Sequence, residues 1–245
     1  GLDTFQKYFA DYEEQYVLIG GAACDILFES NEVNFRATRD LDMVLIVEAL
    51  TPEFGEKFWR FIVDGKYRNK ATNGSNPQFY RFNKPEDDNF PKMIELFCRS
   101  DFKLKDAKGI TPIHIDDEVS SLSAILLNDD YYKALLDGKE VRKGLSVLRP
   151  EYIILFKAKA YLDLKKQKDL GEKVDSSDIK KHKKDVLRIA SELMLEKVEE
   201  LPIAVDADIH SFIDLLEQEP FDQNSLKRFG LKNEDVVEVL KQVFG

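Results

Sequence analysis

The sequence predicts an α+β fold, in which a mixed sheet flanked by helices is followed by a mainly helical C-terminal region. Over the first half of the chain, short segments rich in Val, Leu and Ile are separated by turn residues and amphipathic stretches. From Pro150 onward the apolar residues recur with helical spacing. We therefore expect an α/β domain over residues 1–119 and a mainly helical domain over residues 120–245.

The composition is that of an ordinary globular protein, with 43% hydrophobic and 33% charged residues in 245. The net charge of -10 argues against nucleic-acid binding through the overall field, although it leaves a local basic groove open. No apolar run approaches the roughly 18 residues of a membrane span, so we expect no membrane partner. The N-terminus lacks a signal-peptide pattern, and Cys24 and Cys98 lie in apolar surroundings, which indicates a cytoplasmic protein.

The first elements follow from local patterns. An amphipathic pattern predicts a short helix over residues 3–14, and "YVLIGG" predicts a strand that ends in the paired Gly20 and Gly21. Residues 22–30 are expected to form a helix that begins at this turn. Residues 41–49, "LDMVLIVEA", are apolar on both faces, as in a central strand.

Thr51 is placed to cap a helix over residues 52–63, with Pro52 in its first turn. "QFYRFNK" and "KMIELFCR" predict two further strands, because they are rich in aromatic and apolar residues and are separated by the turn-rich "PEDDNFP". "TPIHID" predicts a short fifth strand.

The remaining elements are mostly helical. "SLSAILLN" and "GLSVL" are expected to be short strands. After them we expect a helix over residues 150–167, a polar linker, a helix over residues 176–194, and two or three short helices to the end of the chain.

Asp40 and Asp42 stand at the start of a predicted buried strand. The alternation of side chains along a strand puts both carboxylates on the same face, where they repel each other. A hard divalent cation such as Mg²⁺ relieves this repulsion, because it draws carboxylate oxygens together. The simpler alternative is a strand cap or a solvated sheet edge.

Glu95 repeats this pattern, because it lies between apolar neighbours in "KMIELFCR". An isolated carboxylate there needs a partner or a raised pKa. If this strand lies beside the Asp42 strand, Glu95 completes a three-carboxylate site for two Mg²⁺ ions roughly 3.5–4 Å apart. The alternative is that Glu95 faces solvent on a half-exposed sheet.

Gly20 and Gly21 mark a predicted strand-to-helix turn upstream of these carboxylates. The absence of side chains lets backbone N–H groups and a helix N-terminus approach a phosphate. Glycine is also common in ordinary turns, so the pair alone is weak evidence for a phosphate site. The ordered set of paired glycines, D-x-D and a later strand carboxylate is stronger evidence than any one of them.

This order of motifs resembles the polymerase-beta-like nucleotidyltransferase superfamily, and more closely the AbiEii-type nucleotidyltransferases of abortive-infection and toxin–antitoxin systems. Their signature is a glycine pair followed by R-x-S/T-x-D-h-D. The chain supplies Arg36, Thr38, Asp40, Leu41 and Asp42 in that order.

The resemblance continues in the helical half, where the family carries E-x-x-x-x-x-K-x-x-A and a later K/R-D pair. Matching residues in this chain are Glu151, Lys157, Ala160, Lys184 and Asp185. The chain departs from the family in two ways. Arg188 stands where a second acidic residue often follows, and the spacer between the glycines and the D-x-D is longer than is usual in the superfamily.

The resemblance implies a Mg²⁺-dependent transfer of a nucleoside monophosphate from a nucleoside triphosphate to an acceptor hydroxyl. It implies that Asp40, Asp42 and Glu95 hold the metal ions, with Glu95 as third ligand or as the base for the acceptor. The resemblance also implies that a set of glycine, polar and basic residues binds the nucleotide: Gly20, Gly21, Arg36, Thr38 and Lys157.

Within the helical half, the resemblance implies that Lys157 contacts the phosphates and that Asp185 orients Lys157 or the acceptor. The alternatives are a helix-surface lysine and a surface ion pair between Asp185 and Lys181. The family also implies a toxin with an antitoxin protein as partner and with tRNA or another RNA as acceptor.

The segment from Lys157 to Lys184 is rich in lysine, in contrast to the acidic chain as a whole. Such a segment binds a nucleic-acid backbone or forms a solvated face. Two other functions stay open: a small-molecule nucleotidyltransferase of the antibiotic-modifying kind, and a non-catalytic nucleotide-binding protein that acts through a partner.

Overall fold

The chain folds into two compact units, of which the first is discontinuous in sequence. The structure is a computed structural model that describes residues 1–30, 40–68, 79–98 and 125–245. The first unit comprises the described residues of Gly1–Asp116 together with Lys139–Leu148, and the second those of Asp117–Gly138 with Arg149–Gly245.

A six-stranded mixed sheet with the order β3-β4-β2-β1-β6-β5 forms the centre of the first unit. Its strands are β1 Tyr16–Ile19, β2 Asp40–Leu45, β3 Phe79–Asn83, β4 Met93–Cys98, β5 Lys139–Arg142 and β6 Leu145–Leu148. The pairs β2–β4 and β1–β6 are parallel, and the other neighbours are antiparallel. The predicted mixed sheet is therefore confirmed, and the strand that contains Glu95 lies beside the strand that contains Asp42.

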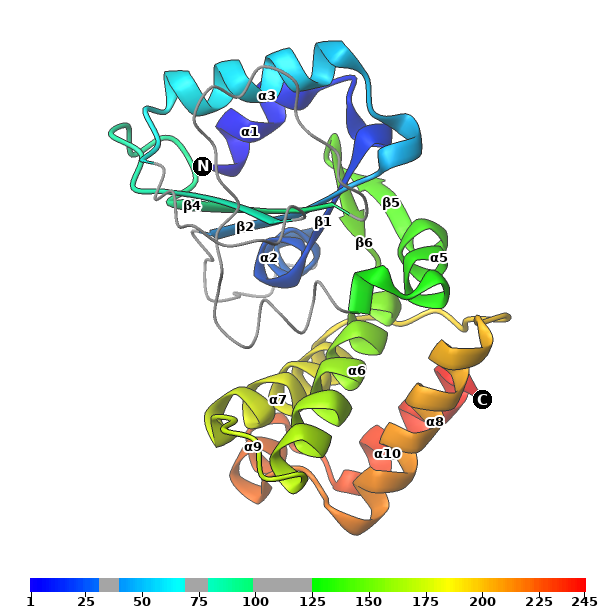
Figure 1. Cartoon of the computed structure of the whole chain (residues 1–245). Helices are drawn as coiled ribbons and strands as arrows, with labels where there is room; N and C mark the ends of the chain where they lie inside the picture. Colours follow the sequence, from blue (N-terminus) through cyan, green and yellow to red (C-terminus); the bar gives the residue numbers. More distant parts are fainter. Residues whose placement is uncertain (31–39, 69–78, 99–124) are drawn as a thin grey trace. The chain divides into compact units, whose positions relative to one another are not determined.

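Helices cover both faces of this sheet. In Figure 1, α1 (Leu2–Phe9) and α3 (Pro52–Asp64) lie over one face and α2 (Gly20–Ser30) lies over the other. The predicted cap of α3 is confirmed, because the Thr51 Oγ1 atom accepts a hydrogen bond of 3.3 Å from the Phe54 N–H. Short 3₁₀ turns, Glu13–Gln15 and Val47–Ala49, occupy the ends of the first predicted helix and of the second predicted strand.

An aromatic core joins α1 and α3 to the sheet. The rings of Phe5 and Phe9 are stacked with centroids 4.4 Å apart, and Phe61 lies 5.4 Å from Phe9. Burial of such large rings stabilises the contact strongly, because each removes about 150–250 Å² from water. Alternation along β2 then turns the buried Leu41 and Met43 towards one face of the sheet and Asp42 towards the other.

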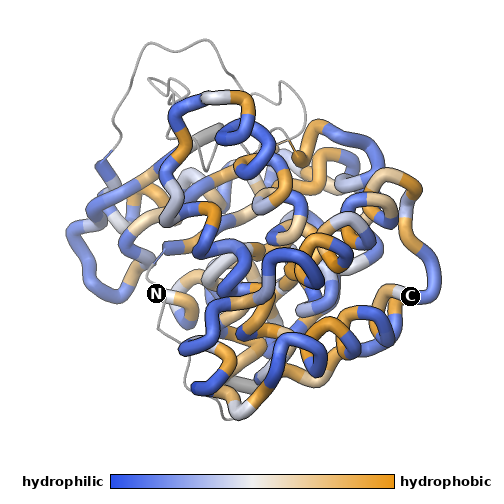
Figure 2. Tube along the Cα trace, turned by 90° about the horizontal axis from the view of Figure 1, so that it is seen from below, coloured by the Kyte–Doolittle hydropathy of each residue, from blue (hydrophilic) through white to orange (hydrophobic). Residues whose placement is uncertain are grey.

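The second unit is helical, as predicted. Its helices are α5 Asp129–Asp137, α6 Pro150–Asp169, α7 Ser176–Glu192, α8 Ile203–Gln218, α9 Gln223–Phe229 and α10 Asn233–Phe244. Helix α6 packs against α7 and α8, and α10 packs against both of these. Hydrophobic and hydrophilic residues alternate along the tube in Figure 2. Helices α7 and α10 each bury one apolar stripe, as amphipathic packing requires, whereas residues 150–156 of α6 are all buried. Among the helices in the described ranges, none has an apolar stretch long enough to cross a membrane.

Three predicted elements need comment. Residues 125–127 of "SLSAILLN" form a helical turn rather than a strand, because a short apolar run suits a buried helix as well as a strand. The strand β5, "KEVR", was not predicted, since its charged residues suit only the edge of a sheet, which is where it pairs with β6. The expected strand "TPIHID" lies outside the described residues.

Candidate functional site

The pairing of β2 with β4 brings two of the predicted carboxylates together. Asp42 lies directly opposite Glu95 in the parallel register, and Asp40 precedes Asp42 by two residues on the same face. Side chains directly opposite each other on neighbouring strands lie within contact distance. Glu95 is only 7% exposed, whereas both aspartates are partly exposed, so the site opens to solvent on the aspartate side.

Arg81 of β3 is a member of this cluster that the sequence analysis missed. It lies opposite Glu95 in the antiparallel register of β3 and β4. Its Nε and Nη2 atoms lie 2.6 and 2.5 Å from the same oxygen of Glu95, Oε1. The available signal was a cation between two aromatic residues in the predicted strand, "FYRFN", since a charge there needs a partner just as Glu95 does.

The electrostatics of Glu95 reflect these neighbours. Burial raises the pKa of the Glu95 carboxyl, and the charge of Asp40 raises it further. The Arg81 guanidinium and a hydrogen bond with the Asp42 side chain lower the pKa without cancelling the effect of burial. Two carboxyl groups at hydrogen-bond distance need a proton or a cation between them, because two ionised carboxylates repel. The pair Asp42–Glu95 is therefore suited to share a proton or to bind a cation.

Gly20 brings the start of α2 against this pair. Its φ of +61° is a conformation that favours glycine, and a Cβ atom built on Gly20 would overlap the Oδ2 atom of Asp42. Gly20 and Gly21 thus form the first turn of α2 with no side chain between the helix N-terminus and Asp42. The first N–H groups of a helix lack intrahelical partners and are suited to bind phosphate.

The donor set fits a hard divalent cation in its chemistry, because all three predicted ligands offer carboxylate oxygens. In the register, Asp42 lies opposite Glu95 on the neighbouring strand, and Asp40 lies on the same face. Among the described residues, no three or more His, Cys, Asp or Glu side chains converge as a preformed metal cluster. The metal-binding roles of Asp40, Asp42 and Glu95 stay predictions.

Lys157 and Asp185 contact each other in the second unit. The Lys157 Nζ atom of α6 lies 2.9 Å from the Asp185 Oδ2 atom of α7, and the side chains are 16% and 30% exposed. The contact is an ion pair of limited exposure, and the functional roles of Lys157 and Asp185 stay predictions. No single unit holds both this pair and the carboxylates of the sheet. Arg36 and Thr38 lie outside the described residues.

Glu151, the first residue of the matched helical motif, has a structural contact. Its Oε1 atom accepts a hydrogen bond of 2.6 Å from the Glu196 N–H, and its side chain is almost fully buried. Within the described residues, its Oε2 atom has no hydrogen-bond partner. Burial raises the pKa of the Glu151 carboxyl. Glu151 therefore ties α6 to the extended segment before α8.

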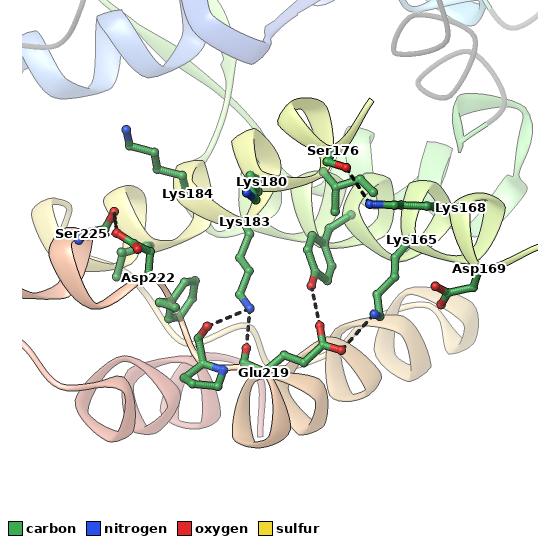
Figure 3. A pocket seen from close by; sticks show the side chains of 15 residues that line it. Lys165, Lys168, Asp169, Ser176, Lys180, Lys183, Lys184, Glu219, Asp222 and Ser225 are labelled. Carbon is green, nitrogen blue, oxygen red and sulfur yellow. Dashed lines mark hydrogen bonds and ion pairs between the residues drawn. The ribbon is translucent and has the colours of Figure 1, made fainter. Parts of the chain in front are cut away.

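A cavity of about 670 Å³ lies among α6, α7 and the residues that follow α8. Figure 3 shows its lysines and carboxylates. It is lined by five lysines and three carboxylates: Lys165, Lys168, Lys180, Lys183, Lys184, Asp169, Glu219 and Asp222. The predicted lysine-rich segment therefore lines a concave surface with more positive than negative side chains.

The lysines of this cavity fall into two groups. Lys165 forms an ion pair of 3.0 Å with Glu219, and the Lys183 Nζ atom donates to the carbonyl oxygens of Glu219 and Pro220. Lys180 and Lys184 are exposed, and within the described residues neither is held by a hydrogen bond or an ion pair. They are one helical turn apart on α7, so both ammonium groups lie on one face, where an anion can bind.

No family model and no curated protein matches the chain. Among solved structures, the chain is similar to the crystal structure of an antigenic nucleotidyltransferase-like protein from Paracoccidioides brasiliensis. The two share 14% identity with a TM-score of 0.46, over 98% of this chain and 92% of that chain. A likeness at this level does not assign a function, and the AbiEii-type family stays a prediction from the motifs.

Gly20→Ala tests the contact between α2 and Asp42. We expect it to lower the free energy of unfolding by about 2–4 kcal/mol, because it adds a left-handed alanine and an overlap with the Asp42 carboxylate. The matched control is Gly230→Ala, since Gly230 has a similar φ of +66° and open space around its Cβ position. Urea denaturation measures both. An equal decrease in the free energy of unfolding in the two variants would show that the contact with Asp42 does not contribute to stability.

Glu151→Gln tests the buried carboxyl of α6. Folding raises the pKa of Glu151 above its ordinary value of 4.5, so ionisation of Glu151 destabilises the folded state as the pH rises. We expect the stability of the variant relative to the wild type to increase as the pH rises from about 4.5 towards neutral, where the wild-type carboxyl ionises. Thermal or urea unfolding across this range measures the difference, with Glu172→Gln as an exposed control for the lost charge. A difference that is independent of pH contradicts the prediction.

Proposed function

We propose that this chain is a Mg²⁺-dependent nucleotidyltransferase that moves a nucleoside monophosphate from a nucleoside triphosphate to an acceptor hydroxyl. The observation that supports it best is the juxtaposition of Asp42, Glu95 and Gly20 on one face of the sheet. It combines carboxylates suited to a cation with a helix N-terminus suited to phosphate.

In this proposal each residue has a distinct role. Gly20 and Gly21 present the free N–H groups of α2 to the triphosphate. Asp40 and Asp42 hold the cation, and Glu95 is the third ligand or the base for the acceptor hydroxyl. A bound Mg²⁺ supplies positive charge that reduces the repulsion between the triphosphate and the carboxylates.

The reaction is an in-line displacement at phosphorus. The acceptor oxygen forms a bond to the α-phosphorus, the bond from that phosphorus to the bridging oxygen of the β-phosphate breaks, and pyrophosphate leaves. The hydroxyl proton passes to Glu95 where that residue is the base, and to water where Glu95 is the third metal ligand. Lys157, oriented by Asp185, neutralises charge on the phosphates in this proposal, as the motifs imply.

We propose that the acceptor is RNA, for which the motif resemblance implies tRNA or another RNA. The lysine-lined cavity supports an acceptor with a phosphate backbone, because its lysines stand out in a chain of net charge -10. On the same resemblance we propose that the protein is the toxin of a toxin–antitoxin pair in the cytoplasm, with an antitoxin protein as partner. A small-molecule acceptor and a non-catalytic nucleotide-binding role are the alternatives that the following experiments separate.

Nucleotide binding is tested by thermal unfolding with each nucleoside triphosphate and Mg²⁺. A bound nucleotide at about 100 times its dissociation constant stabilises the folded state by about 2.7 kcal/mol. We expect this stabilisation with at least one nucleotide and a marked loss of it in Asp42→Asn, which keeps the side-chain size and removes the charge. The absence of any nucleotide- and metal-dependent shift in the wild type would contradict the proposal.

Transfer is tested with labelled ATP, GTP, CTP and UTP in the presence of total RNA. We expect label on RNA with the wild type and at least a hundredfold less with Asp42→Asn, since a lost metal ligand removes several kcal/mol of charge stabilisation. Label on small molecules alone indicates the antibiotic-modifying type of enzyme. Nucleotide binding without any label transfer indicates the non-catalytic alternative.

The charge reversal Lys180→Glu/Lys184→Glu tests the cavity. We expect it to weaken the binding of an RNA oligonucleotide and to reduce the slope of log affinity against log salt by about 1–2, because two phosphate contacts are lost. Fluorescence anisotropy at several salt concentrations measures both quantities. The matched control, Lys7→Glu/Lys133→Glu, makes the same charge change at exposed helix positions that do not line the cavity. An equal effect of both double variants would show that only net charge matters.

A further inference from the structure

The two close contacts of Arg81 with Glu95 fall on one oxygen of the carboxylate. Both close nitrogens of Arg81, Nε and Nη2, contact Oε1, at 2.6 and 2.5 Å. The pair is well shielded, with side-chain exposures of 22% for Arg81 and 9% for Glu95. A charge-assisted contact of this kind, away from bulk water, restrains the carboxylate strongly. Glu95 is therefore held from the β3 side while it faces Asp42 on the β2 side.

This arrangement limits the way in which Glu95 can bind a metal ion. Ca²⁺ sites commonly use a bidentate carboxylate, with six to eight oxygen ligands in a flexible geometry. Mg²⁺ requires a near-octahedral arrangement with short bonds, which single carboxylate oxygens provide. With Oε1 held by Arg81, Glu95 has one oxygen left for a cation.

We infer that Arg81 is a positioning residue that restricts Glu95 to one metal-binding oxygen, and that it thereby selects Mg²⁺ or Mn²⁺ over Ca²⁺. The inference rests on the proposed function, because it takes Asp42 and Glu95 to be cation ligands. It adds a residue outside the predicted motifs and a property, metal selectivity, that those motifs do not specify.

A purely structural ion pair between Arg81 and Glu95 would also explain their contact, and its loss would also destabilise the fold. The two roles differ in one measurable respect. Removal of the Arg81 charge changes the affinity for all divalent cations in the same direction, since the Coulomb interaction depends on charge. The ratio of Ca²⁺ affinity to Mn²⁺ affinity cancels this shared effect and reports the number of oxygens that Glu95 offers.

The experiment is a competition between Ca²⁺ and Mn²⁺ on the full chain, with bound Mn²⁺ measured by electron paramagnetic resonance. In Arg81→Ala we expect the ratio of Ca²⁺ to Mn²⁺ affinity to rise about tenfold, the size of effect that neighbours of metal ligands have. Arg81→Lys keeps one cationic donor for Oε1 and is expected to stay near the wild-type ratio. The control Arg60→Ala removes an exposed arginine of α3 and should leave the ratio unchanged.

Circular dichroism establishes that each variant is folded, and Arg81→Met, which keeps more of the side-chain volume, replaces Arg81→Ala if that variant is not. Mn²⁺ binding in the wild type with an unchanged ratio in Arg81→Ala overturns the inference and leaves the proposed function standing. If the ratio of Ca²⁺ to Mn²⁺ affinity rises as much in Arg81→Lys as in Arg81→Ala, the inference is overturned as well. If the wild type shows no Mn²⁺ binding that is lost in Asp42→Asn, the proposed function is overturned together with the inference.

Discussion

The parallel pairing of β2 with β4 is the constraint on which the candidate site depends. Its register places Asp42 opposite Glu95 and, on the other face of the same strands, Met43 opposite Leu96. Met43 and Leu96 are fully buried. A slip of one residue would move every side chain of a strand to the opposite face of the sheet. The apolar packing under α1 and α3 therefore holds the carboxylates in place.

The same pairing creates an electrostatic problem that the surrounding residues reduce. Asp40, Asp42 and Glu95 gather negative charge on one face of a largely buried sheet, which is unfavourable without counter-charges. Arg81 supplies a full positive charge on one side of Glu95, and the N-terminus of α2 at Gly20 supplies partial positive charge beside Asp42. An open aspartate side remains, where a cation can complete the balance.

In the second unit, charges that look alike in the sequence have different roles in space. Lys157 pairs with Asp185, whereas Lys183 is held by backbone carbonyls and by the rings of Tyr161 and Phe221, with centroids 5.6 Å away. Burial lowers the pKa of Lys183, which fits a lysine that binds the chain rather than a ligand. A lysine-rich segment is therefore a weak guide to nucleic-acid binding until its internal partners are known.

Local sequence by itself determined the features that depend on neighbouring residues along the chain. These are the Thr51 cap, the glycines at the start of a helix, the shared face of Asp40 and Asp42, and the unusual carboxylate of Glu95. Each follows from strand alternation, helix geometry or turn chemistry over a few residues. The same local patterns left the apolar residues 125–127 ambiguous between strand and helix.

Only the tertiary structure decided which distant segments became neighbours. The pairing of β3 with β4 placed Arg81 against Glu95. The hairpin of β5 and β6 belongs to the first unit, and pairing with β6 makes the charged segment "KEVR" a strand. Helix packing joined Lys157 to Asp185. These contacts depend on long-range pairing and on burial of whole faces, which no short stretch of sequence specifies. The sequence therefore indicated candidate residues for the chemistry, and the fold decided which charges they meet.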